Sequence, residues 1–432
     1  MSEALSIIIF LSTLFVLLGI GVWVGAALLL TAILGMALFT SAPIGDSMAV
    51  TIWGEQSSWT LTALPLFIWM SEILFRSKLS ETLFRGLAPF LRRLPGGLLH
   101  VNVGASAVFA AISGSSAATV ATVGKMSIPE LQQRNYPEHM IIGTLSGAGT
   151  LGLLIPPSIS MIIFGVTVNE SISKLFMAAM IPGLCLALMF MIYIVIWAKL
   201  NRASFNPVED LDVSHLGRRV LDLAPVLLLI IGVIGSIYSG IATATEAAAL
   251  GVLGAILLSL SQRSMSWQSF TDSIMGSVRT TAMIMFILMG AGFLSLAMGF
   301  TGIPRALAET IEGWKLSPLA LIAILTVFYI ILGCFLDGLS SIVLTMAVIE
   351  PMVRAAGFDM LWFGVYLMIV VEMAQITPPI GFNLFVLQGM TGRDMGFISK
   401  ASFPMFLVMC VFVVILVMVP GLATWLPEVL SK

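Results

Sequence analysis

The sequence predicts an all-α integral membrane protein made of two inverted copies of one helical unit, each with a re-entrant hairpin and a proline-broken helix. Three observations lead to this fold class. Of 432 residues, 59% are hydrophobic and 10% are charged, and the mean hydropathy is +1.08, far more apolar than a soluble domain. Prolines recur at a constant spacing, and Lys and Arg gather on one side of the predicted topology.

The composition also excludes several classes of function. The 20 Lys and Arg against 22 Asp and Glu leave no basic surface for nucleic acid, so we expect no nucleic-acid partner. The three cysteines and three histidines show neither a disulfide framework nor a metal-ligand spacing. Neither a Ser-His-Asp order nor an HExxH motif occurs, and therefore we expect no enzymatic chemistry and no cofactor.

The prolines reveal an internal duplication. Four of them recur at one offset of 222 residues, namely Pro129 and Pro351, Pro156 and Pro378, Pro157 and Pro379, and Pro182 and Pro404. Four matches at one offset among 19 prolines predict two copies of one unit. The predicted parts are a first unit over 1–200, a cytoplasmic linker over 201–216 and a second unit over 217–432.

Apolar runs and turn-forming residues divide each unit into elements. In the first unit they predict spans near 4–20, 22–40 and 60–75, an amphipathic interfacial stretch at 79–94, an apolar pair at 98–128 interrupted by "SGSSAAT", a broken span at 138–164 and a span at 173–198. The second unit repeats the order with 217–239, 243–262, 280–298, an amphipathic piece at 300–314, an interrupted region at 317–352 containing "LDGLSS", a broken span at 360–388 and a span at 400–425.

The interrupted regions decide the topology. If they are re-entrant hairpins, each unit has five crossings, and the second unit enters the membrane upside down. With the N-terminus outside, only Lys174, Arg305, Lys315, Arg354 and Lys432 then lie outside, as the preference of Lys and Arg for cytoplasmic loops requires. The alternative is a plain duplication with ordinary spans.

Inverted repeats with helices broken at corresponding positions point to the midplane site of a secondary transporter. The breaks free carbonyl oxygens that suit a hard cation such as Na⁺, and the half-helix N-termini suit an anionic substrate. The Na⁺ site candidates at the hairpin tips and breaks are Gly114, Ser115, Ser116, Thr119, Pro156, Pro157, Asp337, Gly338, Ser340, Ser341, Thr377 and Pro378. Ser158 and Asn383 are substrate candidates. Taken singly, such hydroxyls also occur as helix–helix contacts.

Charged residues within apolar segments are further candidates, because their insertion is costly. Asp337 either adds a formal charge to a cation site or caps a helix. Glu372 either coordinates a ligand or holds the unwound backbone, and Glu246 beside Thr243 is expected to cap a helix start. Arg279 is either an anchor for a substrate carboxylate or a cytoplasmic-end arginine.

The segments "AAISGSSAATVATVG", "GTLGLLIPPSISMIIFG", "SGIATATEAAALG" and "EMAQITPPIGFNLFVLQG" resemble the large membrane subunit of the tripartite ATP-independent periplasmic (TRAP) transporters. "ALPLFIWM" and "TTAMIMFILMGAG" extend the resemblance over essentially the whole chain. The sequence departs from its own repeat at Ser71 and Glu72, which stand where the second unit has Gly290 and Ala291. That difference leaves the packing of the segment open.

This resemblance implies an elevator-type carrier in the bacterial inner membrane that is driven by Na⁺ and imports an organic acid, such as a C4-dicarboxylate, a keto acid or a sialic acid. It implies two partners, a small four-helix membrane subunit and a periplasmic substrate-binding protein. The small subunit is expected as a separate chain. The resemblance places the family's cation-site segments on 114–119 with Pro156 and Pro157, and on 337–341 with 377–379.

Segment 44–59 is too polar to span a membrane, and its tryptophans predict an interfacial position against lipid or the small subunit. Two other functions fit the composition. One is a standalone Na⁺- or H⁺-coupled organic anion carrier that needs no binding protein. The other is a channel or membrane scaffold subunit, which would show no saturable, sodium-dependent uptake.

Overall fold

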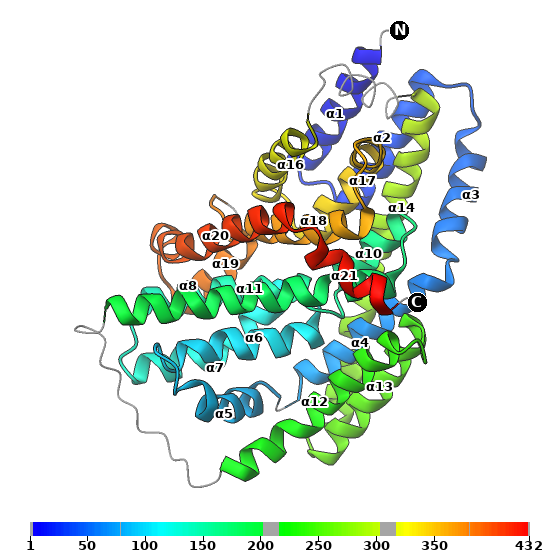
Figure 1. Ribbon diagram of the computed structural model, residues 1–432. Coiled ribbons are helices and arrows are strands. Elements are labelled where there is room, and N and C mark those ends of the chain that lie inside the picture. Colours follow the sequence, from blue (N-terminus) through cyan, green and yellow to red (C-terminus); the bar gives the residue numbers. More distant parts are fainter. Residues whose placement is uncertain (1–2, 78, 202–215, 303–316, 380, 431–432) are drawn as a thin grey trace.

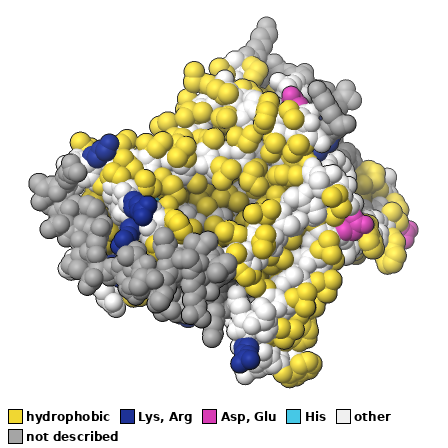
Figure 2. All heavy atoms as spheres, turned by 60° about the horizontal axis from the view of Figure 1, so that its bottom comes forward, with side chains coloured by type: hydrophobic (Ala, Val, Ile, Leu, Met, Phe, Trp, Pro, Cys, Tyr) yellow, Lys and Arg dark blue, Asp and Glu magenta, His cyan; other side chains and the backbone are white. Residues whose placement is uncertain are grey.

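The computed structural model describes residues 3–77, 79–201, 216–302, 317–379 and 381–430, and its regular structure in those ranges is helical throughout (Figure 1). Five of the helices are long and apolar enough to cross a membrane, or up to seven if each of two bent pairs counts as one span. Figure 2 shows hydrophobic side chains over most of one face, with few charges among them. The chain is therefore built as a multi-pass membrane protein.

One half of the molecule is formed by the early helices of both units. Its elements are α1 (Glu3–Gly19), α2 (Val24–Phe39), α3 (Ile44–Gln56), η1 (Trp59–Thr62), α4 (Ala63–Phe75), α12 (Leu216–Tyr238), α13 (Ala244–Ser261) and α14 (Trp267–Thr301). We call it the scaffold half. Helix α14 packs along α2 and α4. A Cβ on Gly290 would lie 2.5 Å from the Gly25 carbonyl oxygen, so the missing side chain lets α2 and α14 cross closely.

The departure at Ser71 and Glu72 has a packing explanation. Glu72 forms an ion pair with Arg76, the residue that directly follows α4. The Glu72 carboxylate also fills the space over Gly276 of α14, where a Cβ would lie 2.6 Å from it. The two units therefore use this segment differently, one for an ion pair and the other for a helix crossing.

The other half contains the hairpins and broken helices. Helices of the first hairpin and of the C-terminal part form a stack on the left of Figure 1, and the second hairpin, α16 and α17, lies beside α14 in the upper middle. From the first unit come α5 (Leu79–Leu91), α6 (Leu99–Ser113), α7 (Ser116–Gln133), α8 (Glu138–Gly149), α9 (Leu151–Leu154), α10 (Ile159–Thr167) and α11 (Ile172–Leu200). From the second come α16 (Pro318–Gly333), α17 (Gly338–Ala355), α18 (Met360–Gln375), α19 (Phe382–Thr391), α20 (Met395–Met418) and α21 (Gly421–Leu430). We call it the hairpin half.

The hairpin half contains the same order of elements twice. Helices α7 and α17 are both 18 residues long, and each is followed by a tight turn with one left-handed residue, Asn135 (φ 59°) in the first and Gly357 (φ 80°) in the second. Each hairpin packs on the broken helix of the other unit, because α7 contacts α19 and α17 contacts α10. The two units are therefore interlocked in this half.

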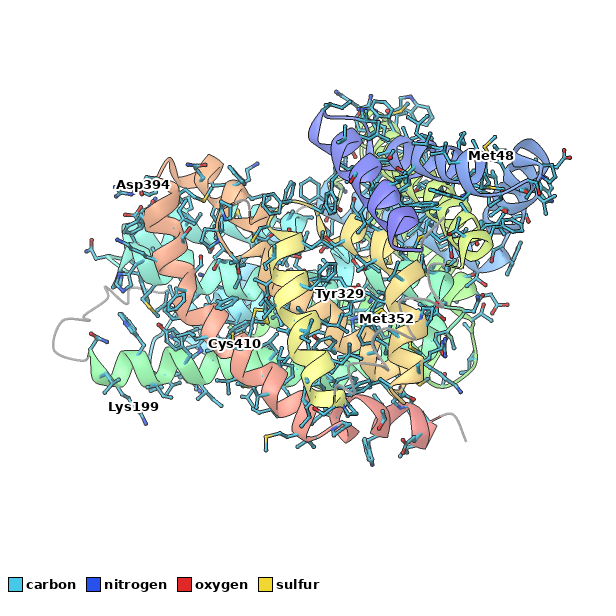
Figure 3. All side chains as sticks on the ribbon, turned by 90° about the horizontal axis from the view of Figure 1, so that it is seen from above. Met48, Lys199, Tyr329, Met352, Asp394 and Cys410 are labelled. Carbon is cyan, nitrogen blue, oxygen red and sulfur yellow. The ribbon has the colours of Figure 1, made fainter. Side chains whose placement is uncertain are left out.

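Buried polar bonds hold the centre of the hairpin half together. Tyr329 of α16 is fully buried, and its hydroxyl lies 2.6 Å from the Thr345 hydroxyl of α17. Figure 3 shows Tyr329 near the middle of the molecule, whereas Lys199 and Asp394 lie at one outer end. By bonding to each other, the two hydroxyl groups gain hydrogen bonds that apolar core side chains and lipid could not provide.

Helices occupy both interrupted regions and residues 79–91, and helices end at both predicted breaks. Whether the interrupted regions are re-entrant hairpins stays a prediction. Two predicted bounds are wrong. The span at 280–298 is longer, because a capping box at Ser266 starts α14 well before its apolar part. The span at 400–425 is shorter, since α20 ends at Met418, just before Pro420. The piece at 300–314 and the linker at 201–216 fall almost wholly outside the described residues.

Segment 44–59 forms α3, none of whose residues is buried. The side chains of Trp53 and Trp59 are 76% and 77% exposed. Figure 1 shows α3 at the edge of the molecule, and Figure 3 places Met48 of this helix at the far side from Lys199. Helix α3 also forms, with residues Trp59–Phe75, one of the two bent pairs that count together as a candidate span, so the interfacial location stays a prediction.

Candidate functional site

The tip of the first hairpin packs against the helix break of its own unit. Gly114 ends α6 in the left-handed conformation with φ 56°, which glycine adopts without strain. A Cβ there would lie 3.0 Å from the Pro157 carbonyl oxygen. Ser115 caps α7 by accepting a hydrogen bond from the Ala118 N–H. The tip therefore combines a tight turn with a helix start whose free N–H group is hydrogen-bonded.

Hydroxyl groups at this tip bond to one another and to the backbone of the tip. The Ser113 and Thr119 hydroxyls lie 2.9 Å apart, and the Thr119 hydroxyl donates to the Ser115 carbonyl at 2.7 Å. These bonds stiffen the tip, because each hydroxyl is held by a neighbour. Ser116 is different, since its partners come from the second unit.

The first helix break is enclosed by protein. Helix α9 ends at Leu154, the Pro156–Pro157 peptide bond is cis, and both prolines are buried. The Ser158 side chain caps α10 by accepting from the Met161 N–H at 3.4 Å. Proline supplies no N–H, so carbonyls of the preceding helix end lack their usual donors. The break therefore offers backbone acceptors inside the protein.

Three side chains from the two units meet in one buried cluster. The Ser116 hydroxyl of α7 donates to Glu372 Oε2 of α18 at 2.9 Å, and the Asn383 amide of α19 donates to the same Ser116 oxygen. The exposed fractions are 5%, 1% and 0% for Ser116, Glu372 and Asn383. We call these three residues the cross-unit cluster. It joins residues that are 256 and 267 positions apart.

The second hairpin and break are more open. Asp337 is exposed and caps α17, accepting from the N–H groups of Leu339 at 3.2 Å and Ser340 at 3.3 Å. The Thr377 hydroxyl donates to the Met373 carbonyl at 2.7 Å. Pro378 is exposed and follows Thr377 directly. Of the two expectations for Asp337, the geometry shows the helix cap.

The remaining candidates at the second tip lie close to α18. A Cβ on Gly338 would lie 3.0 Å from the Val371 side chain. Ser340 and Ser341 are buried, and the Ser341 hydroxyl has no hydrogen-bond partner. An unpaired buried hydroxyl remains available to a ligand.

Arg279 lies apart from these residues. It is exposed on α14, in the scaffold half, whereas the cross-unit cluster lies in the hairpin half. Glu246 forms the expected capping box with Thr243 at the start of α13. The structure thus brings Ser116, Glu372 and Asn383 together and separates Arg279 from them.

Two cross-unit ion pairs were not predicted. Arg393, between α19 and α20, donates to both carboxylate oxygens of Glu138 at 2.8 and 2.6 Å. The Glu138 carboxylate raises the pKa of the Arg393 guanidinium, so the pair stays charged. Arg354 of α17 contacts Glu170 at 3.4 Å. Neither pairing has a signal in the sequence, because the partners belong to different units.

Comparison with known proteins identifies the family of the chain. Residues 11–422 match the family model of the "Tripartite ATP-independent periplasmic transporter, DctM component". The chain belongs to this family. It is therefore a TRAP transporter large permease, and its relatives are transporter permeases rather than enzymes.

Curated TRAP permeases with different named substrates are similar to it. The C4-dicarboxylate large permease of Pseudomonas aeruginosa is 31% identical over 88% of this chain and 89% of its own length. The isethionate permease of Oleidesulfovibrio alaskensis is 31% identical over 95% of this chain, which spans only 64% of that longer protein. The sialic acid large permease of Vibrio cholerae is 28% identical over 95% of this chain and 96% of its own length.

A solved transporter shares the fold of this TRAP permease. The YdaH transporter of Alcanivorax borkumensis aligns with a TM-score of 0.68 over 92% of this chain and 97% of that chain. The sequence identity is 13%, so the likeness concerns the fold alone.

Proposed function

We propose that the chain is the membrane permease of a Na⁺-coupled, binding-protein-dependent importer of an organic acid of the C4-dicarboxylate, keto acid or sialic acid class. The observation that carries the proposal is the cross-unit cluster, where a hairpin tip of one unit bonds to the broken helix of the other inside the protein. Membrane proteins tolerate broken helices and buried polar groups only where they line a path or site.

The site would hold Na⁺ at the two hairpin tips and breaks. Oxygen ligands suit this hard cation, and the structure supplies unpaired ones in the buried Ser160 and Ser341 hydroxyls, besides the backbone carbonyls before the prolines. Ser158 and Asn383 lie in the first turns or caps of α10 and α19. There a substrate carboxylate would meet the positive ends of two helices.

Transport would proceed by an elevator movement of the hairpin half against the scaffold half, with the second unit inverted relative to the first. The recurrence of hairpin, broken helix and long helix in both units supports this proposal. We leave Arg279 outside the site and assign it to the cytoplasmic end of α14, because its side chain is exposed. The inner membrane, a small four-helix subunit and a periplasmic binding protein belong to the same proposal.

Na⁺ coupling supplies enough free energy for uptake. One Na⁺ moving down a tenfold gradient and 100 mV releases about 3.7 kcal/mol. Two ions release about 7.4 kcal/mol, while a monoanion entering against the potential costs about 2.3 kcal/mol. Two sites, one at each hairpin tip, therefore suffice to concentrate the substrate.

The test is uptake of labelled organic acids into proteoliposomes that contain this chain and its co-purified small subunit. We expect uptake only with an inward Na⁺ gradient and with the binding protein present. Na⁺-driven uptake without the binding protein would instead establish a standalone carrier. Conductance without saturable, Na⁺-dependent uptake would contradict both.

A further inference from the structure

A small apolar pocket lies where the scaffold half meets the hairpin half. Its walls include Met70 of α4 and Ile230 of α12 on the scaffold side, and Ile112 of α6 and Pro157 of the first helix break on the other side. Every described side chain that lines the pocket is hydrophobic, so the lining offers a polar or charged ligand no side-chain hydrogen bond. A ligand of this pocket must therefore be apolar.

Two glycines of α13 explain why the space is unfilled. The Met70 sulfur lies 2.6 Å from the position of a Cβ on Gly251, and the Leu229 side chain occupies the place that a Cβ on Gly254 would take. Both side chains therefore lie against the backbone of α13, where a larger residue would have kept them out. A gap remains between them and the tip of α6, although protein interiors are otherwise closely packed.

The pocket lies beside the lipid-facing surface of α12. Leu229 and Ile230 in its wall are half-buried, and their neighbours Leu228 and Ile231 are 66% and 64% exposed. These residues lie near the middle of the apolar stretch Leu223–Tyr238, whose exposed side chains face hydrocarbon in a membrane. The pocket with its mouth has about 210 Å³ of space, but its enclosed part admits only a group about as large as a water molecule. That size suits the end of an alkyl chain and excludes a ring.

We propose that this pocket binds the end of an acyl chain of a surrounding phospholipid. The walls of an empty apolar pocket lack dispersion contacts on one side, and a chain end restores them without leaving apolar surroundings. Water does not take its place, because it would find no polar partners there. Met70 can adjust to the chain, since its side chain is unbranched and flexible. The ends of acyl chains lie at the middle of a bilayer, which is the depth expected for the helix breaks.

The bound chain end lies beside a direct contact between the two halves. The Ser71 hydroxyl of α4 donates to the Ser113 carbonyl of α6 at 3.5 Å, and Ser71 and Ser113 directly follow the pocket residues Met70 and Ile112. Because the walls belong to both halves, a relative movement of the halves changes the pocket and with it the affinity for the chain. This dependence rests on the proposed elevator movement, whereas the binding site itself does not.

The test is photolabelling in liposomes that contain the permease and its co-purified small subunit. The probe is phosphatidylcholine with an aliphatic diazirine at the end of one acyl chain, and the labelled residues are located by mass spectrometry. We expect adducts on Met70 and Ile112, which are 3% and 2% exposed and therefore out of reach of lipid at the protein surface. Phosphatidylcholine with the diazirine near the head group should label neither residue.

Two neighbouring residues of α12 provide a variant and its matched control. Ile230→Phe enlarges a side chain in the pocket wall and should lower the labelling of Met70 and Ile112 severalfold. Ile231→Phe makes the same change at a lipid-facing residue that does not line the pocket, and it should leave that labelling unchanged. Adducts on the exposed Leu228 should be equal in the two variants. Thermal unfolding verifies that both variants fold alike.

Two results would overturn the proposal. One is labelling confined to exposed residues such as Leu228 and Ile231, which would make the pocket a dry packing gap. The other is equal labelling of Met70 and Ile112 in Ile230→Phe and Ile231→Phe, which would mean that the probe reaches them by another route. Failure of the proposed function would appear separately. In that case Met70 and Ile112 are still labelled, while uptake of the labelled organic acids ignores the Na⁺ gradient.

Discussion

At the scale of single residues, the Ser116 hydroxyl joins the two units, because it donates to Glu372 and accepts from Asn383. Ser116, Glu372 and Asn383 were each candidates because they lie beside a hairpin tip or a proline break. Their meeting at one hydroxyl could not be predicted, since it depends on how α7 crosses the broken helix of the other unit. Local bonds were predictable, as the capping box of Glu246 and Thr243 shows, because they need only neighbouring residues.

Asp337 gives a residue-scale prediction. Because its side chain caps α17, Asp337→Ala should lower stability by about 1 kcal/mol, while Asp337→Asn should cost far less. Denaturant or thermal unfolding of the purified protein measures the difference. Equal losses in the two variants would show that the carboxylate charge, and not the cap, is what matters at this position.

At the scale of helices, proline and glycine determined what could be predicted. The paired prolines located both breaks, because they remove donors that a continuous helix needs. The start of α14 was not predicted, because a capping box at Ser266 begins the helix in a polar stretch, well before its apolar part. Gly152 also escaped prediction as a contact. A Cβ there would lie 2.6 Å from the Ser115 backbone, a neighbour 37 positions away whose approach no local pattern reveals.

Gly152 gives the prediction at this scale. Gly152→Ala should push α9 away from the hairpin tip and cost about 1–3 kcal/mol, as overpacking does, with a loss of uptake. Gly232→Ala is the control, because nothing lies within 4 Å of its added Cβ and alanine favours a helix. Both are compared by thermal unfolding and by uptake. An unaffected Gly152→Ala would mean that the tip and α9 separate freely.

At the scale of the whole molecule, the duplication could be predicted from the spacing of prolines. The contact of each hairpin with the broken helix of the other unit could not be predicted, because a repeat in the sequence does not say which unit each hairpin contacts. The pairs Arg393 with Glu138 and Arg354 with Glu170 join the units at places far apart in the chain. Such contacts follow from packing alone, and charges in different units carry no shared pattern.

The inverted arrangement gives a prediction for the whole molecule. Gln133 and Ala355 are exposed residues at corresponding ends of α7 and α17. In a variant without Cys185, Cys334 and Cys410, a cysteine replacing Gln133 should react with an impermeant reagent only from the cytoplasmic side. A cysteine replacing Ala355 should react only from the periplasmic side. Labelling of both from one side would rule out an inverted second unit.

The cross-unit cluster also imposes an order on biosynthesis. Ser116 and Asn383 are separated by 267 positions, which a ribosome translating about 5–20 residues per second covers in roughly 13–53 s. During that interval the first hairpin lacks α19, the helix of the second unit on which α7 packs. It must wait in the membrane or at its surface with its polar tip solvated. Insertion of the first unit is therefore completed only by the arrival of the second.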